Sequence, residues 1–319
     1  MTAVTEWLLD SDPAIRWQVL RDLVGAPEPE WAGERARVEH EGWGAELLAR
    51  QDPDGQWAGG AFFPSDFTRE AWEAEGQPWT ATCFALDQLR DFGLDPDSAS
   101  AARTVALVGA NSRWDEGDQS FWDGEVEECI NGRTVASGAY FGRDACALVE
   151  RLVTERQPDG GWNCERANGS VRSSFDTTIN VLEGLLEFER ATGGTPASRD
   201  ARRQGEEFLL ARGLFRRLGT GEPADPDYLH PVHPCRWHYD ILRGLEHFRA
   251  AGLLTGADPD PRLGDAVRVL RDLRDSDGAW HTARSLRGRT WFDLDDGVGR
   301  PSRWLTLKAL RVLAWADPS

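Results

Sequence analysis

Four side chains that suit a zinc ion stand at or near the starts of predicted helices. They are two thiols, Cys129 and Cys164, one carboxylate, Asp176, and one imidazole, His238. Thiolate, imidazole and carboxylate groups are the ligands that Zn²⁺ takes in proteins. Their scattered spacing differs from a local Cys-x-x-Cys pair, so the fold must bring them together. The structural alternatives are that the cysteines are small buried residues and that Asp176 caps a helix.

A second candidate for chemistry is the acidic tetrapeptide Asp293-Leu294-Asp295-Asp296. It resembles the Asp-x-Asp-Asp motif of class II terpene cyclases, in which the middle aspartate protonates an alkene or an epoxide. The matching residue here is Asp295, and the resemblance implies that it is a general acid. That role needs a carboxyl group that stays protonated, with neighbouring carboxylates and a dry cavity around it. The alternative is a solvated loop before a helix, where the helix dipole favours acidic residues.

Two further carboxylates, Glu183 and Asp240, fall on polar stripes of predicted helices. Glu183 lies on the helix expected over 173–190, and Asp240 lies on the helix expected over 235–250. If these stripes face a cavity, the carboxylates can contact a ligand, and a facing pair would suit carbohydrate hydrolysis. If the stripes face water, the carboxylates are only solvated.

The elements that must position these residues are marked by a repeated turn. Its three copies read QDPDGQW (51–57), QPDGGW (157–162) and RDSDGAW (274–280), and each places a tryptophan one residue after Asp-Gly. A signature that recurs at long intervals indicates a repeated supersecondary unit. We therefore expect the chain to be built from repeated helix pairs.

Two kinds of helix alternate along the chain. Charge-rich helices, typical of a water-facing outer layer, are expected over 32–51, 98–113, 146–157, 199–213 and 262–275. Inner helices are expected over 13–24, 78–92, 131–142, 173–190, 235–250 and 301–315. Three inner helices share a proline near the start, at Pro13, Pro234 and Pro301, where its missing N–H costs nothing.

This count predicts an all-α protein whose residues 1–319 form one domain, a closed α/α toroid of about six inner helices ringed by outer ones. The sequence has only short runs of alternating apolar and polar residues, so it gives no evidence for β-strands. Inner helices of such a toroid all start at the same end, so Cys129, Cys164, Asp176 and His238 would meet at one mouth of a central cavity.

The best turn copy, Gln51 to Trp57, resembles the Gln-x-x-Asp-Gly-x-Trp repeat of squalene-hopene cyclases and related triterpene cyclases. The whole chain also resembles the prenyltransferase and squalene-oxidase repeat group, which includes the β subunits of protein prenyltransferases. Both families are α/α toroids. Protein prenyltransferases hold zinc at the toroid mouth with an Asp-x-Cys unit and a histidine. This chain has no Asp-x-Cys, and His238 is its better match.

Triterpene cyclases contain two toroid-like domains with the polyene between them. This chain has the length of one such domain, so the resemblance implies that a complete cyclase of that kind needs a partner subunit or a homodimer.

The net charge and the cysteine count argue against several other classes of protein. The net charge of −18 would repel phosphates, which argues against a nucleic-acid partner. Five cysteines, an odd number, with no secretory signal and no apolar run of membrane-spanning length, predict a cytoplasmic protein without disulfides.

These observations lead to one functional expectation. The chain is expected to be a metal-dependent enzyme of the terpenoid cyclase and prenyltransferase-like group, with a largely apolar, isoprenoid-like small molecule in the cavity. Zinc at the mouth would act as a Lewis acid, and aromatic rings would stabilise positive charge. The alternatives are a non-catalytic ligand-binding or scaffold toroid and a class II-type, acid-initiated cyclase that uses Asp295.

Overall fold

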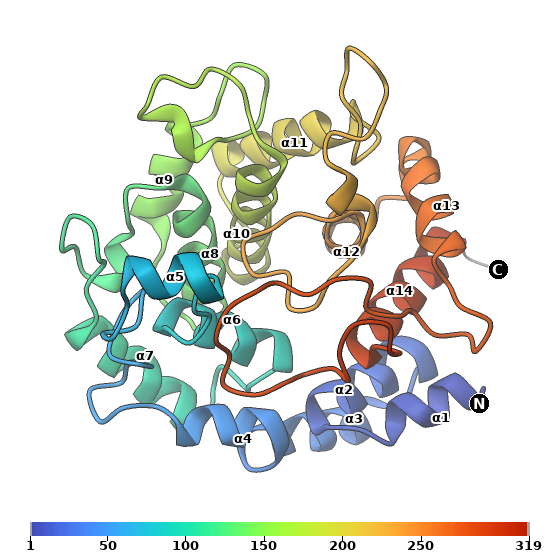
Figure 1. Cartoon of the computed structure of the whole chain (residues 1–319), viewed down its shortest axis with the longest axis horizontal. Helices are drawn as coiled ribbons and strands as arrows, with labels where there is room; N and C mark the ends of the chain where they lie inside the picture. Colours follow the sequence, from blue (N-terminus) through green and yellow to red (C-terminus); the bar gives the residue numbers. More distant parts are fainter. Residues whose placement is uncertain (1, 318–319) are drawn as a thin grey trace. The chain divides into compact units, whose positions relative to one another are not determined.

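The computed structural model describes residues 2–317, and these form α-helices joined by turns and short 3₁₀ or π-helical segments, with no sheet (Figure 1). The all-α prediction is therefore confirmed for the described chain. None of the described helices combines the length and the apolar character that a membrane span requires. The chain divides into two compact units, which we describe separately.

Unit 1 comprises the described residues up to Phe121 together with Arg274–Arg311. Its first residues form short helices, and its later part is an irregular segment that leads into the last helix, α14. The elements are α1 (Ala3–Leu9), α2 (Pro13–Val19), a π-helical turn (Leu20–Val24), α3 (Glu28–Ala36), a 3₁₀ turn (Arg37–Glu39), α4 (Gly42–Ala49), α5 (Arg69–Glu75), α6 (Thr82–Phe92), α7 (Ala99–Asn111) and α14 (Arg303–Ala316), whose last residues belong to unit 2.

Unit 2 comprises Trp122–Leu273 and the described residues from Val312 onward. Its elements are α8 (Glu128–Tyr140), α9 (Cys146–Thr154), a 3₁₀ turn (Cys164–Arg166), α10 (Phe175–Thr192), α11 (Pro196–Leu210), a 3₁₀ turn (Pro226–Leu229), α12 (Ile241–Thr255), a 3₁₀ turn (Pro261–Leu263) and α13 (Gly264–Asp272).

The tightest helix pair of unit 2 is α8 against α10, which run side by side (Figure 1). Two glycines allow this approach. A Cβ atom on Gly132 would lie 2.4 Å from the carbonyl oxygen of Asn180, and one on Gly184 would lie 2.3 Å from the carbonyl oxygen of Gly132. Because both obstacles are backbone atoms, no larger residue fits unless the helices separate.

The three repeated turns form the same hydrogen bonds. In each, the tryptophan amide donates to a threonine hydroxyl of a later helix, at 3.1 Å for Trp57 to Thr82 of α6, 3.1 Å for Trp162 to Thr178 of α10 and 3.0 Å for Trp280 to Thr306 of α14. In the first two, the indole N–H also donates to a carbonyl of the preceding helix, that of Leu47 or Leu152. The turns that share a sequence pattern therefore also share a hydrogen bond from the tryptophan amide to a threonine hydroxyl.

The glycine of each turn has a backbone conformation that other residues rarely adopt. Its φ is +92° at Gly55, +100° at Gly160 and +84° at Gly278, all in the left-handed region. The glycine of each Asp-Gly pair is therefore required by the turn geometry.

Two of the predicted helices differ from the structure. The helix expected over 32–51 is broken into α3, a 3₁₀ turn and α4, because Gly42 has a φ of +63° and the Asp12 carboxylate accepts a bond from the Trp43 amide. The helix expected from 235 begins only at Ile241, where Asp240 caps it by accepting from the Arg243 amide. The residues from Pro234 onward form turns, so the shared proline starts a helix at Pro13 but not here.

Candidate functional site

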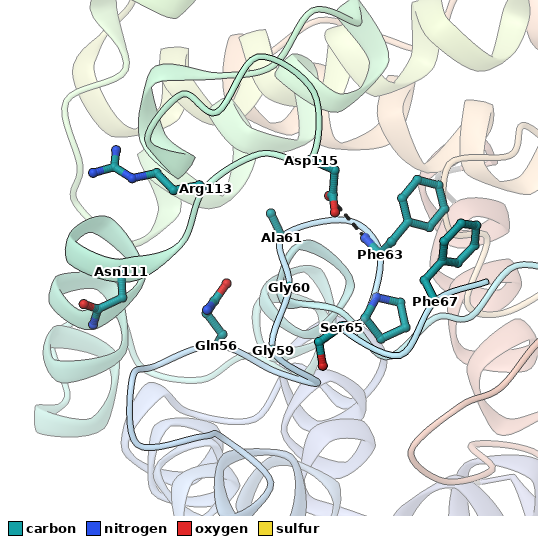
Figure 2. Close-up of a pocket in the computed structure, with 11 residues that line it drawn as sticks. Gln56, Gly59, Gly60, Ala61, Phe63, Ser65, Phe67, Asn111, Arg113 and Asp115 are labelled. Carbon is teal, nitrogen blue, oxygen red and sulfur yellow. Dashed lines mark hydrogen bonds between the residues drawn. The ribbon is translucent and has the colours of Figure 1, made fainter. Parts of the chain in front are cut away.

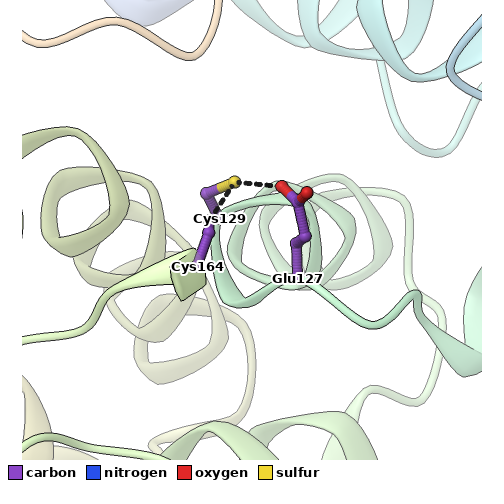
Figure 3. Close-up of side chains that lie close together, drawn as sticks. All are labelled: Glu127, Cys129 and Cys164. Atoms are coloured by element: carbon purple, nitrogen blue, oxygen red, sulfur yellow. Dashed lines mark hydrogen bonds between the residues drawn. The ribbon is translucent and has the colours of Figure 1, made fainter. Parts of the chain in front are cut away.

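Two of the four predicted zinc ligands lie in contact. Cys129 is the second residue of α8, Cys164 begins the 3₁₀ turn before α10, and their sulfur atoms are 2.7 Å apart. Glu127, one residue before α8, accepts a 3.4 Å hydrogen bond from the Cys129 thiol. One ligand atom from each residue lies within 4.8 Å of the other two, which makes a group able to hold a metal ion (Figure 3).

Local contacts hold the Cys164 segment beside the start of α8. The Asn163 side chain caps the 3₁₀ turn by accepting from the Glu165 amide at 3.0 Å. The Cys164 amide donates to the Thr177 hydroxyl at 3.3 Å. Arg166 then forms ion pairs with Glu128 at 2.6 Å and with Glu155 at 2.9 Å. The two thiols are therefore held together by the surrounding polypeptide.

The surroundings of Cys129 favour its neutral thiol when no cation is near. The hydrogen bond from Cys164, burial and the Glu127 carboxylate all raise the pKa of Cys129 well above its usual value. A bound cation would reverse this preference, because it stabilises thiolates directly.

The other two predicted ligands, Asp176 and His238, are not members of this group. The Asp176 carboxylate accepts a 2.7 Å bond from the Tyr239 amide and a 3.3 Å bond from the Tyr228 hydroxyl. Burial raises its pKa, and these bonds oppose the increase. The His238 ring stacks on that of Trp237, with ring centroids 3.6 Å apart. Asp176 thus ties the start of α10 to the segment before α12.

Glu127 is the group member that the sequence analysis did not single out. Its spacing from Cys129, one residue apart in a Glu-x-Cys unit, was the available signal. It was hidden within a run of acidic residues that includes Glu125 and Glu128.

Glu183 and Asp240 both serve structural contacts around Arg243. The Arg243 guanidinium donates to both Glu183 carboxylate oxygens, at 2.8 and 2.7 Å. Asp240 is buried, caps α12 and accepts a 3.1 Å bond from the Val232 amide. Each carboxylate is therefore held by hydrogen-bond donors of its own unit.

Asp295 lines a cavity of about 580 Å³ in unit 1, together with Trp43, Arg303 and its exposed neighbours Asp293 and Asp296. Its Oδ2 accepts a 2.7 Å bond from the Ser302 hydroxyl, whereas its Oδ1 is buried and has no hydrogen-bond partner. Burial raises the pKa of Asp295 to about 6, the Ser302 bond opposes this, and the Asp296 charge adds to it. The carboxyl of Asp295 is thus more buried than those of Asp293 and Asp296.

Unit 1 contains a second cavity, of about 550 Å³, between the loop after the first repeated turn and the end of α7 (Figure 2). The side chains of Phe63 and Phe67 lie on one side of it, and those of Asn111 and Arg113 lie on the other (Figure 2). Its one carboxylate, Asp115, accepts bonds from the backbone amides of Phe62 and Phe63, at 3.0 and 3.3 Å. This cavity therefore offers a binding surface whose one carboxylate is held by backbone amides.

Comparison with known proteins adds no assignment to this geometry. The chain matches no protein-family model, and no curated protein matches it significantly.

Proposed function

We propose that this chain is an enzyme in which Asp295 donates a proton to a largely apolar, isoprenoid-like substrate bound in the adjoining cavity. One observation carries the proposal: Asp295 lines a cavity of about 580 Å³, is itself mostly buried, and has a pKa of about 6. Strongly perturbed acids in cavities are candidates for general acids. The resemblance of residues 293–296 to the class II terpene cyclase motif points to the same carboxyl.

The chemistry follows from the raised pKa. At pH 7 an acid with a pKa of about 6 is still about one-tenth protonated, whereas an ordinary aspartate is almost fully ionised. Proton transfer to an epoxide oxygen of the substrate would break a C–O bond and leave a carbocation. The Trp43 ring in the cavity wall could stabilise that charge by a cation–π contact.

The test compares Asp295→Asn with Asp293→Asn and Asp296→Asn, which remove exposed carboxyls of the same cavity. Squalene and 2,3-epoxysqualene serve as probes, with products followed by gas chromatography. We expect Asp295→Asn to lower turnover by at least about 100-fold, in the range of general-acid effects, and the two controls to have smaller effects. Equal turnover in Asp295→Asn would rule out the acid. Wild-type protein that binds either probe without converting it would favour a ligand-binding protein.

The architecture proposed for this enzyme is the α/α toroid. Its support is the contact that the three turns share, in which each tryptophan amide donates to a threonine hydroxyl of a later helix. An experimental structure would test the closure of the ring, and the molecular mass in solution would test whether the chain forms a homodimer or needs a partner subunit.

A metal-assisted reaction is the second candidate function. The observation that favours it is the meeting of Cys129 and Cys164 beside Glu127. A Zn²⁺ ion at that place would supply a Lewis acid or lower the pKa of a bound water. Turnover that survives Asp295→Asn but is lost on chelation would favour this candidate over the acid.

A further inference from the structure

Three donors in unit 2, from Glu127, Cys129 and Cys164, lie close enough together to hold one ion. With Zn–S near 2.3 Å and Zn–O near 2.0 Å, a tetrahedral site separates its sulfur and oxygen ligands by about 3.5 Å and two sulfurs by about 3.8 Å. The Cys129 sulfur lies 3.4 Å from the Glu127 oxygen, which matches the first spacing. The two sulfurs, 2.7 Å apart, would have to separate by about 1 Å, which small side-chain rotations can provide.

Contacts between protein side chains hold the frame around the donors in place. Arg166 links the Cys164 segment to Glu128 at the start of α8 and to Glu155 just after α9. The Thr177 hydroxyl accepts from the Cys164 amide and, at 3.3 Å, lies beside the Cys164 sulfur. A binding group held by such supporting contacts loses little entropy when it takes up a ligand.

We propose that Glu127, Cys129 and Cys164 form a binding site for one thiophilic divalent cation, Zn²⁺, with the fourth position open to water. Two sulfur donors select against Mg²⁺ and Ca²⁺, which prefer oxygen. The exposure of Glu127 leaves one side of the group accessible to solvent, and three protein ligands with an open position are typical of reactive zinc sites.

This ligand set differs from the one expected from sequence. Glu127 supplies the carboxylate, and Asp176 remains bonded to Tyr239 and Tyr228. The site also does not depend on the acid chemistry of Asp295, since the two groups belong to different units.

Two thiols this close can alternatively be oxidised to a disulfide. In that reaction each sulfur loses a hydrogen, and an external oxidant such as a glutathione disulfide accepts two electrons. A disulfide would remove both sulfur donors, so it is an outcome that contradicts the metal site.

The experiment measures binding directly, without an activity assay. The full chain is purified under reducing conditions, loaded with Zn²⁺, passed through a weak chelating resin and analysed for metal. Replacement by Co²⁺ then reports thiolate ligation by its charge-transfer absorption. We expect one ion per chain, and affinity at least about 100-fold weaker in Cys129→Ser and Cys164→Ser and about 10-fold weaker in Glu127→Gln.

The matched controls are Cys146→Ser, an exposed cysteine of the same unit, and Asp176→Asn, a carboxylate outside the group. Both should bind Zn²⁺ as the wild type does, with helicity checked by circular dichroism in every variant. A metal content far below one ion per chain overturns the site, and so does equal loss of affinity in Cys146→Ser. A Cys129–Cys164 disulfide that persists in the reduced, metal-loaded sample, detected as a 2 Da lower mass, also overturns it.

Discussion

At the scale of single residues, Asp295 shows that burial can give one of several identical carboxyl groups a raised pKa. Three carboxyls lie within four positions, yet only the middle one is mostly buried, and its pKa is raised to about 6. Sequence identified the tetrapeptide and its middle residue. It could not supply the burial, because that depends on the cavity wall, to which distant residues such as Trp43 contribute.

The proposed acid predicts a specific pH profile. The protonated carboxyl is the active form, so turnover should reach a plateau below pH 6 and fall about tenfold for each pH unit above it. Initial rates with 2,3-epoxysqualene between pH 5 and pH 8 check this expectation. A rate that instead rises through this range would identify a base, not an acid, as the titrating group.

The same burial affects stability. The pKa of Asp295 is higher in the folded protein, about 6, than the ordinary value of 3.8, so the folded state binds the proton more tightly. This contribution is fully present below about pH 4 and is lost as the pH rises through 6. Asp295→Asn removes the buried charge and should stabilise the protein by about 2–3 kcal/mol at pH 8.

Urea denaturation at pH 4 and pH 8 measures this effect. The variant and the wild type should have similar stability at pH 4, since both side chains are then neutral in the folded protein. The exposed Asp296→Asn serves as the control and should change little at either pH. A destabilised Asp295→Asn at pH 8 would show that the charged carboxyl makes a favourable contact.

At the scale of elements, most helices that follow the repeated turns could be predicted, because their amphipathic patterns are long. The misplaced boundaries depend on contacts from far along the chain. The start of α12 is delayed because Asp240 is its cap and because the Tyr239 amide is bonded to Asp176. Likewise, Cys129 and Cys164 were predicted to meet, but Glu127 was not distinguished from the acidic residues beside it.

The repeated turns predict a measurable cost when their threonine is removed. Thr178→Val keeps the volume but leaves the buried Trp162 amide without its acceptor. We expect a loss of about 1–3 kcal/mol in the free energy of unfolding. Thr154→Val is the matched control, because Thr154 is exposed and bonds only to its own helix, and its effect should stay within about 0.5 kcal/mol.

The contact between α8 and α10 predicts a similar cost when one of its glycines is enlarged. Gly132→Ala places a methyl group against the carbonyl of Asn180, so the two helices must separate. The expected destabilisation is about 1–3 kcal/mol, typical of an overpacked interior. Gly33→Ala, on an open face of α3, should be neutral or stabilising by comparison. Thermal denaturation of both variants measures the difference.

At the scale of the whole molecule, the sequence correctly predicted the all-α class of the described residues, whereas composition and local patterns did not specify the arrangement of the helices. The prediction rested on the two alternating kinds of amphipathic helix and on the lack of strand patterns. Closure of the helices into a ring stays a prediction, because it depends on how the two units pack, and local patterns do not specify that.

The negative net charge predicts that this protein does not bind DNA tightly. With a net charge of −18, duplex DNA should bind no more tightly than the weakest non-specific complexes, with a Kd of about 10⁻⁴ M or higher at physiological salt. Fluorescence anisotropy with a labelled duplex measures this affinity. Micromolar binding would reveal a basic surface that the composition conceals.

The hydrogen bonds of the repeated turns affect how such chains can lengthen by gene duplication. Between Leu152 and Thr178, one stretch of polypeptide carries both the carbonyl that accepts from the Trp162 indole and the hydroxyl that accepts from its amide. A gene duplication that copies this stretch therefore copies donor and acceptors together. Extra copies can lengthen the protein by whole helix pairs without new partners having to evolve elsewhere.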